Sequence, residues 1–500
     1  MKTYLTLFFL EICLLLIGCM STVRAQPTRR YTAEIEKRIK QVEQNLCTWM
    51  QIDGRPNWTL AERMRFYNVK GVSIAVIHNY QIEWAKGYGW ADTTDKRPVS
   101  ENTLFQAASI SKSLNAIGCL KLVQNQQVAL DKDINQYLKR WKFPYDSLAH
   151  RKVITLGNLL SHTAGLSVHG FAGYTDKEPR PSLLQVLDGL PPANSPAVRL
   201  MAEPGTTMEY SGGGTTLTQL LVEDVTQKTY AQYMQTEVLN PLGMVHSTFA
   251  QPPAVKLQHE LATGYRYDGK PIGSLFHIYP EQAAAGLWTT PTDIATFVLE
   301  MQLSLQGKSS KVLSPKMTRR MLTPYLPRYD VALGTFIFMR EGKEAAYFQH
   351  TGLNEGFSSV YYGSVEGGNG VVIMCNSDNF GLIRELVNSV ASIYTWKDFY
   401  NPVVKKEIKV ASATTDAYIG SYTWSEAPDQ TITVYKQGEK LLYHNSTSRN
   451  TWEMHFTDDT TFFLYELPQN EYTFSRDANG SIDGIQGQRE DQEWKLSKIK

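Results

Sequence analysis

A serine and a lysine three residues apart are the side chains in this sequence whose types and spacing best suit covalent chemistry. Ser109 and Lys112 begin an apolar pattern that continues at Leu114, Ile117 and Leu120, as expected of a helix that buries one face. A spacing of three predicts that the hydroxyl and the amine lie on the same face, one turn apart. A lysine amine can take the proton of an attacking hydroxyl once burial and nearby positive charge disfavour its ammonium form. The pair therefore predicts a nucleophile beside its base.

Spacing alone does not separate this pair from a helix-start serine and a solvated lysine, and the same pattern recurs at residues 497–500. Two later segments add specificity. Tyr210 precedes a glycine-rich stretch that opens a helix predicted over residues 216–225, and His350-Thr351-Gly352 ends a short predicted strand. In this order, Ser-x-x-Lys, Tyr-Ser-x and a basic residue before Thr-Gly resemble the three motifs of the penicillin-recognising serine enzymes.

The branch that the chain resembles contains the class C β-lactamases, the D-aminopeptidases, and the β-lactamase-fold esterases and transacylases. The resemblance covers residues 31–396 and includes further segments at 71–77, 159–166, 240–244 and 285–290. It implies an α+β, β-lactamase/transpeptidase-like fold. In that fold an antiparallel sheet is flanked by helices and joined to a mainly helical subdomain.

The resemblance also implies catalytic roles. Ser109 becomes the acylated nucleophile and Lys112 its partner in proton transfer. Tyr210, a phenol near two cations, serves as base or acid in the second half-reaction. His350 stands where lysine is usual in the β-lactamases, and the backbone N–H groups of Ser109 and Leu353 form the oxyanion hole.

The expected substrate-binding residues are Gly212, Thr351, Gly352, His169 and Phe171. Where the β-lactamases of this branch have asparagine, Gly212 has no amide to hold a peptide-like side chain. His350 is expected to be only partly charged near neutral pH. Both differences argue against efficient β-lactam hydrolysis and for an ester or another activated acyl donor. The segment 168–174 brings aromatic rings to the site if it covers the cleft, and is otherwise a packed surface loop.

We therefore expect an exported serine enzyme that forms an acyl-enzyme at Ser109 and passes the acyl group to water or to a small alcohol or amine. Esterase or transacylase activity on a small apolar substrate is favoured over D-amino-acid peptidase activity, and both over β-lactamase activity, with a penicillin-binding protein as a further alternative. The alternative from another class is a catalytically idle relative that binds a ligand, through residues 416–500. No cofactor is implied, and the oligomeric state stays open.

The charge balance and the spacing of possible metal ligands exclude further classes of partner. The 50 basic and 49 acidic residues leave no net field for nucleic acid or an anionic membrane surface. His259-Glu260 begins like a zinc-protease helix but lacks the second histidine, so no metal site is predicted. The expected partners are a small-molecule acyl donor and, for transfer, an alcohol acceptor.

Residues 1–26 read as an export signal, with Lys2 before an apolar run. Two cleavage sites compete: one after Ala25, and a bacterial lipoprotein box that ends at Cys19. The mature protein is thus expected in the periplasm or the medium, or anchored as a lipoprotein.

Three cysteines remain outside the signal, Cys47, Cys119 and Cys375, and buried free thiols are the expected state. No other apolar run is long enough to span a bilayer.

At 500 residues the chain predicts more than one domain. We expect a serine hydrolase/acyltransferase domain at 27–396, a linker at 397–415 and an all-β domain at 416–500. In the first, the pattern predicts helices over 31–51 and 381–396, a hairpin of strands 71–77 and 82–88, and strands at 332–339, 345–349, 358–362 and 371–375. In the last, short strands with turns, one of them at Gly487, predict a barrel or sandwich that resembles lipocalin-like domains.

Overall fold

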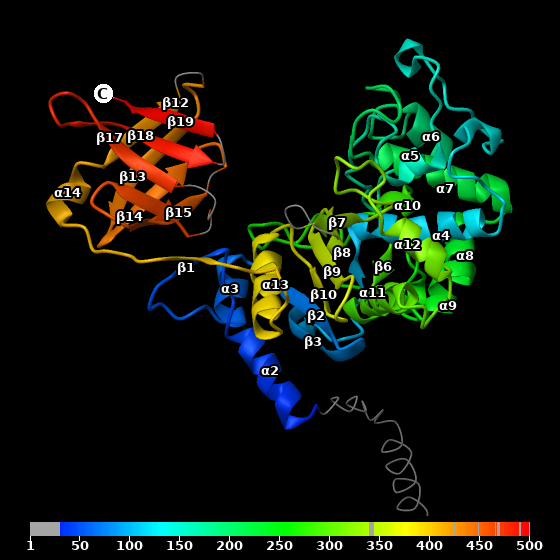
Figure 1. Ribbon diagram of the computed structural model, residues 1–500, viewed down its shortest axis with the longest axis horizontal. Coiled ribbons are helices and arrows are strands. Elements are labelled where there is room, and N and C mark those ends of the chain that lie inside the picture. Colours follow the sequence, from blue (N-terminus) through cyan, green and yellow to red (C-terminus); the bar gives the residue numbers. More distant parts are fainter. Residues whose placement is uncertain are drawn as a thin grey trace, which may run out of the picture. The chain divides into compact units, whose positions relative to one another are not determined.

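A seven-stranded antiparallel sheet joins strands from residues 71–98 with strands from residues 336–339 and 345–375 (Figure 1). The structure, a computed structural model, describes residues 31–339, 345–424, 427–448, 450–465, 467, 471–489 and 492–499. The strands run in the order β4-β3-β2-β10-β9-β8-β7. Their bounds are β2 Gly71–His78, β3 Gln81–Asp92, β4 Arg97–Pro98, β7 Phe336–Met339, β8 Ala345–Asn354, β9 Phe357–Ser364 and β10 Gly370–Cys375.

Strands far apart in the sequence meet in this sheet, as predicted. β2 pairs with β10 from Val72 opposite Cys375 to Ile77 opposite Gly370. The predicted hairpin joins β2 to β3 through Asn79 and Tyr80, which both have left-handed backbones. Such a two-residue turn matches the twist of the strands that it connects.

Helices cover both faces of the sheet. α11 (Pro291–Leu305) packs on β2, β3, β9 and β10, whereas α13 (Gly381–Ile393) packs on β9, β10 and α3 (Leu60–Phe66). Residues 71–77 of β2 and all of β10 are buried, because neither side of these strands faces solvent. Thr290 caps α11 ahead of Pro291, the start that the sequence predicted.

The region between the two groups of strands is mainly helical. α4 (Ser111–Gln124) lies at its centre and is buried on nearly all sides, as a helix surrounded by other elements must be. α7 (Gly212–Thr226) packs against it. The remaining helices are α5 Leu156–Leu160, α6 Leu183–Asp188, α8 Tyr230–Met234, α9 Asn240–Leu242, α10 Gln282–Ala285 and α12 Pro315–Met321.

Several element bounds differ from the sequence prediction. The first helix, α2, covers only Ala33–Glu43, because Leu46 forms a bridge with Trp58 and β1 (Met50–Ile52) follows. α7 begins at Gly212 rather than at residue 216, because the Ser211 side chain caps it. β8 continues to Asn354, so His350-Thr351-Gly352 lies inside a strand and not at its end.

Eight strands between Gly420 and Lys498 close into a barrel, which settles the barrel-or-sandwich alternative. Buried aromatic rings fill its interior, among them Tyr422, Phe462 and Phe474. Its strands are β12 Gly420–Trp424, β13 Thr431–Gln437, β14 Lys440–Asn445, β15 Thr451–Phe456, β16 Thr461–Leu464, β17 Glu471–Arg476, β18 Ile482–Arg489 and β19 Gln492–Lys498. Before the barrel, β11 (Val403–Lys405) pairs in parallel with β1, and α14 (Ser412–Asp416) follows.

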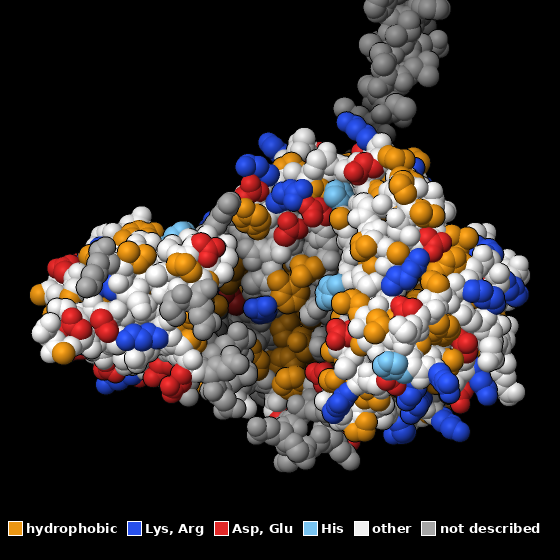
Figure 2. All heavy atoms as spheres, turned by 90° about the horizontal axis from the view of Figure 1, so that it is seen from above, with side chains coloured by type: hydrophobic (Ala, Val, Ile, Leu, Met, Phe, Trp, Pro, Cys, Tyr) orange, Lys and Arg blue, Asp and Glu red, His pale blue; other side chains and the backbone are white. Residues whose placement is uncertain are grey.

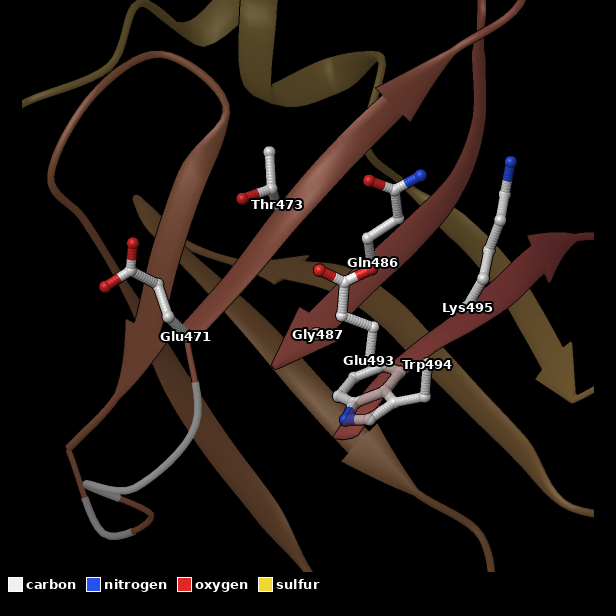
Figure 3. A pocket seen from close by; sticks show the side chains of 7 residues that line it. All are labelled: Glu471, Thr473, Gln486, Gly487, Glu493, Trp494 and Lys495. Atoms are coloured by element: carbon white, nitrogen blue, oxygen red, sulfur yellow. The ribbon is translucent and has the colours of Figure 1, made fainter. Parts of the chain in front are cut away.

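The predicted turn at Gly487 is wrong, since this residue lies inside β18 opposite Trp494. A side chain at position 487 would meet the Trp494 indole at 1.9 Å, so the glycine makes room for the ring. A hollow of about 440 Å³ lies beside them, between Glu471, Glu493 and Lys495 (Figure 3). Its lining is largely polar, unlike the aromatic interior of the barrel.

The surface and the cysteines agree with the composition. Lys, Arg, Asp and Glu side chains are interspersed over the face seen in Figure 2. Cys47, Cys119 and Cys375 are buried free thiols, as predicted. Within the described residues, no helix is long and apolar enough to cross a membrane. The export signal at 1–26, with its Cys19 alternative, lies outside the described residues.

Buried hydroxyls tie the helix behind Ser109 to the sheet, which gives a first prediction. Tyr361 of β9 contacts the Ser113 hydroxyl of α4 at 2.9 Å and the Thr335 hydroxyl at 3.0 Å. Tyr361→Phe should lower the free energy of unfolding by about 1–2 kcal/mol, because both hydroxyls lose a buried partner. Urea unfolding measures this, with the exposed Tyr267→Phe as the control. Equal stability of the two variants would contradict the role of this network.

Candidate active site

Ser109 lies in a sharp turn directly before the helix α4. The turn is a short 3₁₀ segment, Ala108–Ile110, and α4 begins at Ser111. Ala108 has φ +49°, a left-handed conformation that residues other than glycine rarely adopt. The strained turn leaves Ser109 half-buried at the N-terminal end of the helix.

Lys112 is buried, with 4% of its surface exposed. Its amine lies 3.0 Å from Ser109 Oγ and donates a hydrogen bond to the Ala284 carbonyl at 2.8 Å. Nζ also lies 5.0 Å from the centre of the Tyr210 ring. The structure thus brings the serine of the first motif and the tyrosine of the second together around the Lys112 nitrogen.

Aromatic rings surround Tyr210. The centre of its ring lies 4.3 Å from that of His162, 4.8 Å from that of His169 and 6.3 Å from that of His350. Tyr210 precedes Ser211, whose hydroxyl caps α7, so the start of this helix fixes the chain at the phenol.

His350 is neutral, which corrects the expected partial charge. The side chain is buried on β8, and Nδ1 donates a hydrogen bond to the Thr351 carbonyl at 2.6 Å. Burial, and then the like charge of Lys112, lower the pKa of His350 to about 3. Nε2 is buried without a hydrogen-bond partner among the described residues. His350 is therefore not one of the two cations expected near Tyr210.

β8 lies against the turn that carries Ser109. A side chain at Gly352 would meet the Ala107 carbonyl at 2.2 Å, so only glycine permits this approach. On the other side of Leu353, the Asn354 amide donates to Gln106 Oε1 at 2.9 Å and to the Ala285 carbonyl at 3.1 Å. The backbone at Leu353 is thereby held between two anchors, while the side chains of Thr351 and Leu353 are exposed.

The loop with His169 and Phe171 packs against the start of α7. The Gly212 and Gly213 N–H groups donate to the carbonyls of His169 and Val168, both at 3.0 Å. A side chain at Gly212 would lie 3.0 Å from the Phe171 ring. Phe171 therefore occupies the space next to Gly212, and the loop contributes both aromatic rings to the site.

Sequence patterns did not indicate several positioning groups. Gln106 and Asn354 act as a pair only after folding brings β8 to the short strand β5 (Phe105–Gln106), which pairs with β6 (Trp288–Thr289). The Ala284 carbonyl is a backbone group, which no residue type reveals. His162 lies in a segment that the sequence marked for its resemblance, without a role for its side chain.

The comparison with known families identifies the chain. A family model described as Beta-lactamase matches residues 58–388. The chain belongs to the β-lactamase family. Members of this family are usually serine hydrolases, and the matched residues include Ser109, Lys112, Tyr210 and His350.

Individual relatives of the β-lactamase family are distant. Protein flp of Staphylococcus aureus (strain MW2) is 27% identical over 322 residues, which are 62% of this chain and 60% of flp. The chain thus spans about three-fifths of that relative. Penicillin-binding protein 4* of Bacillus subtilis (strain 168) is 22% identical over 452 residues, 85% of this chain and 94% of that protein. The octameric penicillin-binding protein homologue from Pyrococcus abyssi shares the fold, with a TM-score of 0.61, 20% identity, and coverage of 88% of this chain and 98% of the homologue.

The close approach of β8 to the Ser109 turn gives a second prediction. In Gly352→Ala the new methyl group must displace either β8 or the turn, and a displacement of 1 Å at a reacting centre lowers a rate about 100-fold. We expect that loss in the rate of covalent labelling of Ser109 by a fluorophosphonate. Gly273→Ala, at a position with no atom near the added methyl, is the matched control. An unchanged labelling rate in Gly352→Ala would show that this approach does not set the geometry of the site.

The neutrality of His350 gives a third prediction. Because its pKa is about 3 in the folded protein and near 6.5 when unfolded, the unfolded chain binds more protons between these values, and stability must fall as pH falls from 6.5 towards 3. One such group adds a slope of up to about 1.4 kcal/mol per pH unit. His350→Gln should lack this part of the slope in urea unfolding at pH 4.5, 5.5 and 6.5. The exposed His259→Gln is the control, and parallel stability curves for His350→Gln and wild type would disprove the burial effect.

Proposed function

We propose that the protein is an exported serine esterase or transacylase that forms an acyl-enzyme at Ser109 and passes the acyl group to water or to a small alcohol or amine. The observation that carries the proposal is the buried Lys112 amine, 3.0 Å from Ser109 Oγ. Export rests on the signal-like residues 1–26, with the periplasm, the medium or a lipoprotein anchor at Cys19 as the destination.

In the first half-reaction, unprotonated Lys112 takes the Ser109 proton as Oγ attacks the carbonyl carbon of the donor. The backbone N–H groups of Ser109 and Leu353 stabilise the oxyanion of the tetrahedral intermediate. The bond to the leaving group then breaks, and the leaving alcohol departs with the proton from Lys112. The hydrogen bond from Lys112 to the Ala284 carbonyl orients the amine for both proton transfers.

In the second half-reaction, Tyr210 relays a proton. Its phenol oxygen takes the proton of water or of an acceptor alcohol as the acceptor oxygen attacks the acyl-enzyme, and its own O–H proton passes to the unprotonated Lys112 amine. The ester bond to Ser109 breaks, and Lys112 returns the proton to Ser109 Oγ. Exclusion of water favours transfer to an acceptor over hydrolysis. The Phe171 ring next to the start of α7 supports transfer, since it supplies apolar surface beside Gly212.

Two features support an uncharged ester donor. The neutral ring of His350 offers no positive charge to a substrate carboxylate. Phe171 fills the space beside Gly212, where a side-chain amide would otherwise hold a peptide-like group.

The second candidate is D-amino-acid peptidase or penicillin-binding activity, which the match to 94% of penicillin-binding protein 4* favours. A β-lactamase ranks below both, and a catalytically idle, ligand-binding relative remains the non-enzymatic alternative.

The fourth prediction concerns the two half-reactions. Wild-type protein should be labelled by a fluorophosphonate, and Ser109→Ala should not, because it lacks the nucleophile. Lys112→Ala should acylate about 10²- to 10⁴-fold more slowly, the usual effect of removing a general base. Lys121→Ala, on the same helix, is the control. Tyr210→Phe should acylate but accumulate the acyl-enzyme, which intact-mass spectrometry detects.

The same measurement identifies the substrate class. The protein is exposed to a panel of esters, thioesters and β-lactams, with and without alcohol acceptors, and the mass added to Ser109 names the donor. Esters are expected to acylate fastest. Labelling by none of these reagents would favour the idle relative, whereas fast turnover of β-lactams would overturn the donor assignment.

A further inference from the structure

His162 is a buried histidine that lies beside Tyr210 and for which the sequence assigned no role. It follows α5, has 4% of its surface exposed, and has a left-handed backbone with φ +56°. Backbone hydrogen bonds of the next residue, Thr163, hold His162 in place. The Thr163 N–H donates to the Asn158 carbonyl at 2.8 Å, and the Thr163 carbonyl accepts from Gly205 at 2.7 Å. The residue is thus part of a rigid connection between α5 and the segment that leads to Tyr210.

His162 binds the chain on both sides of Tyr210. The Glu209 N–H donates to the His162 carbonyl at 2.8 Å, and the Ser211 N–H donates to His162 Nδ1 at 3.2 Å. The two rings lie 4.3 Å apart at an angle of 33°. One residue therefore contacts the backbone before the tyrosine, the backbone after it and the face of the phenol.

The Ser211 contact fixes the proton on the other ring nitrogen. A nitrogen that accepts from a backbone N–H carries a lone pair, so Nδ1 is unprotonated and the neutral ring has its proton on Nε2. Burial first, and then the like charge of Lys112, lower the pKa of His162 well below its usual value. Protonation would put two N–H groups against each other and break the contact.

We propose that His162 is a positioning residue for Tyr210: its neutral imidazole accepts from Ser211 and supports the phenol ring so that the phenol stays beside Lys112. The inference rests on the proposed function, because the role of the phenol in turnover is part of it. His162 itself neither contacts Ser109 nor transfers a proton in this account. Its loss should therefore slow the step that needs Tyr210 and leave the attack of Ser109 unaffected.

Two substitutions keep the left-handed backbone and separate the contacts. Asparagine tolerates this conformation and offers an amide oxygen near the place of Nδ1, whereas glycine adopts it freely and offers no acceptor. His162→Asn keeps the acceptor for Ser211 and loses the ring, and His162→Gly loses both. His150 is a matched control position, since it is exposed and also left-handed, with φ +46°.

The variants are assayed with p-nitrophenyl butyrate and with a fluorophosphonate. His162→Gly should lose kcat by about 10- to 100-fold, as expected for a displaced catalytic group, with KM nearly unchanged and the acyl-enzyme accumulating. His162→Asn should recover at least about tenfold of this loss. Ser109 should be labelled at the wild-type rate in both, and His150→Asn and His150→Gly should match wild type in every measurement.

Three results would overturn the inference. The first is turnover by His162→Gly at the wild-type rate. The second is a fall in the labelling rate of Ser109 in His162→Gly by the same factor as kcat. The third is turnover by His162→Asn as slow as that of His162→Gly. The second result would mean that the substitution damages the whole site. Failure of the wild-type protein to be labelled would instead refute the proposed function, so the two failures are distinguishable.

Discussion

Burial of the Lys112 amine next to Ser109 is the constraint on which the rest of the site depends. The amine contacts a hydroxyl, a carbonyl and an aromatic face within a few ångströms. Burial first, and then the like charge of Lys112 in its protonated form, lower the pKa of His162 and of His350. Both rings then act through hydrogen bonds: His350 donates from Nδ1, and His162 accepts at Nδ1. The packing that buries the amine thus also fixes the neutral state of these two rings beside the phenol.

Elements that are far apart in the sequence pack closely around the contact between Lys112 and Ser109. β8 reaches the Ser109 turn only because Gly352 has no side chain, and Asn354 joins the end of that strand to Gln106 and Ala285. The helical half holds Tyr210 through His162 and the cap of α7. The serine lies where the two halves meet, so small shifts of either half change the geometry of the reacting atoms.

Those parts of the fold that depend on local residue patterns and on the order of the motifs could be predicted from the sequence. The sheet that joins both ends of the domain, the start of α11 and the β-barrel followed from alternation, capping residues and turn spacing. The end of α2 and the turn assigned to Gly487 were wrong, because the Leu46–Trp58 bridge and the Trp494 ring over Gly487 are contacts between distant residues. The neutrality of His350 was missed for the same reason, since burial is a property of the packed fold. His162 could have been found only from its position beside Tyr210 in space.

The most direct test of the central claim is a crystal structure of the protein after reaction with an alkyl fluorophosphonate. Our account predicts phosphorus bonded to Ser109 Oγ, the phosphoryl oxygen against the backbone N–H groups of Ser109 and Leu353, and the Lys112 amine within hydrogen-bond distance of Oγ. An adduct on another side chain, or a Lys112 amine turned away from the bonded oxygen, would contradict it.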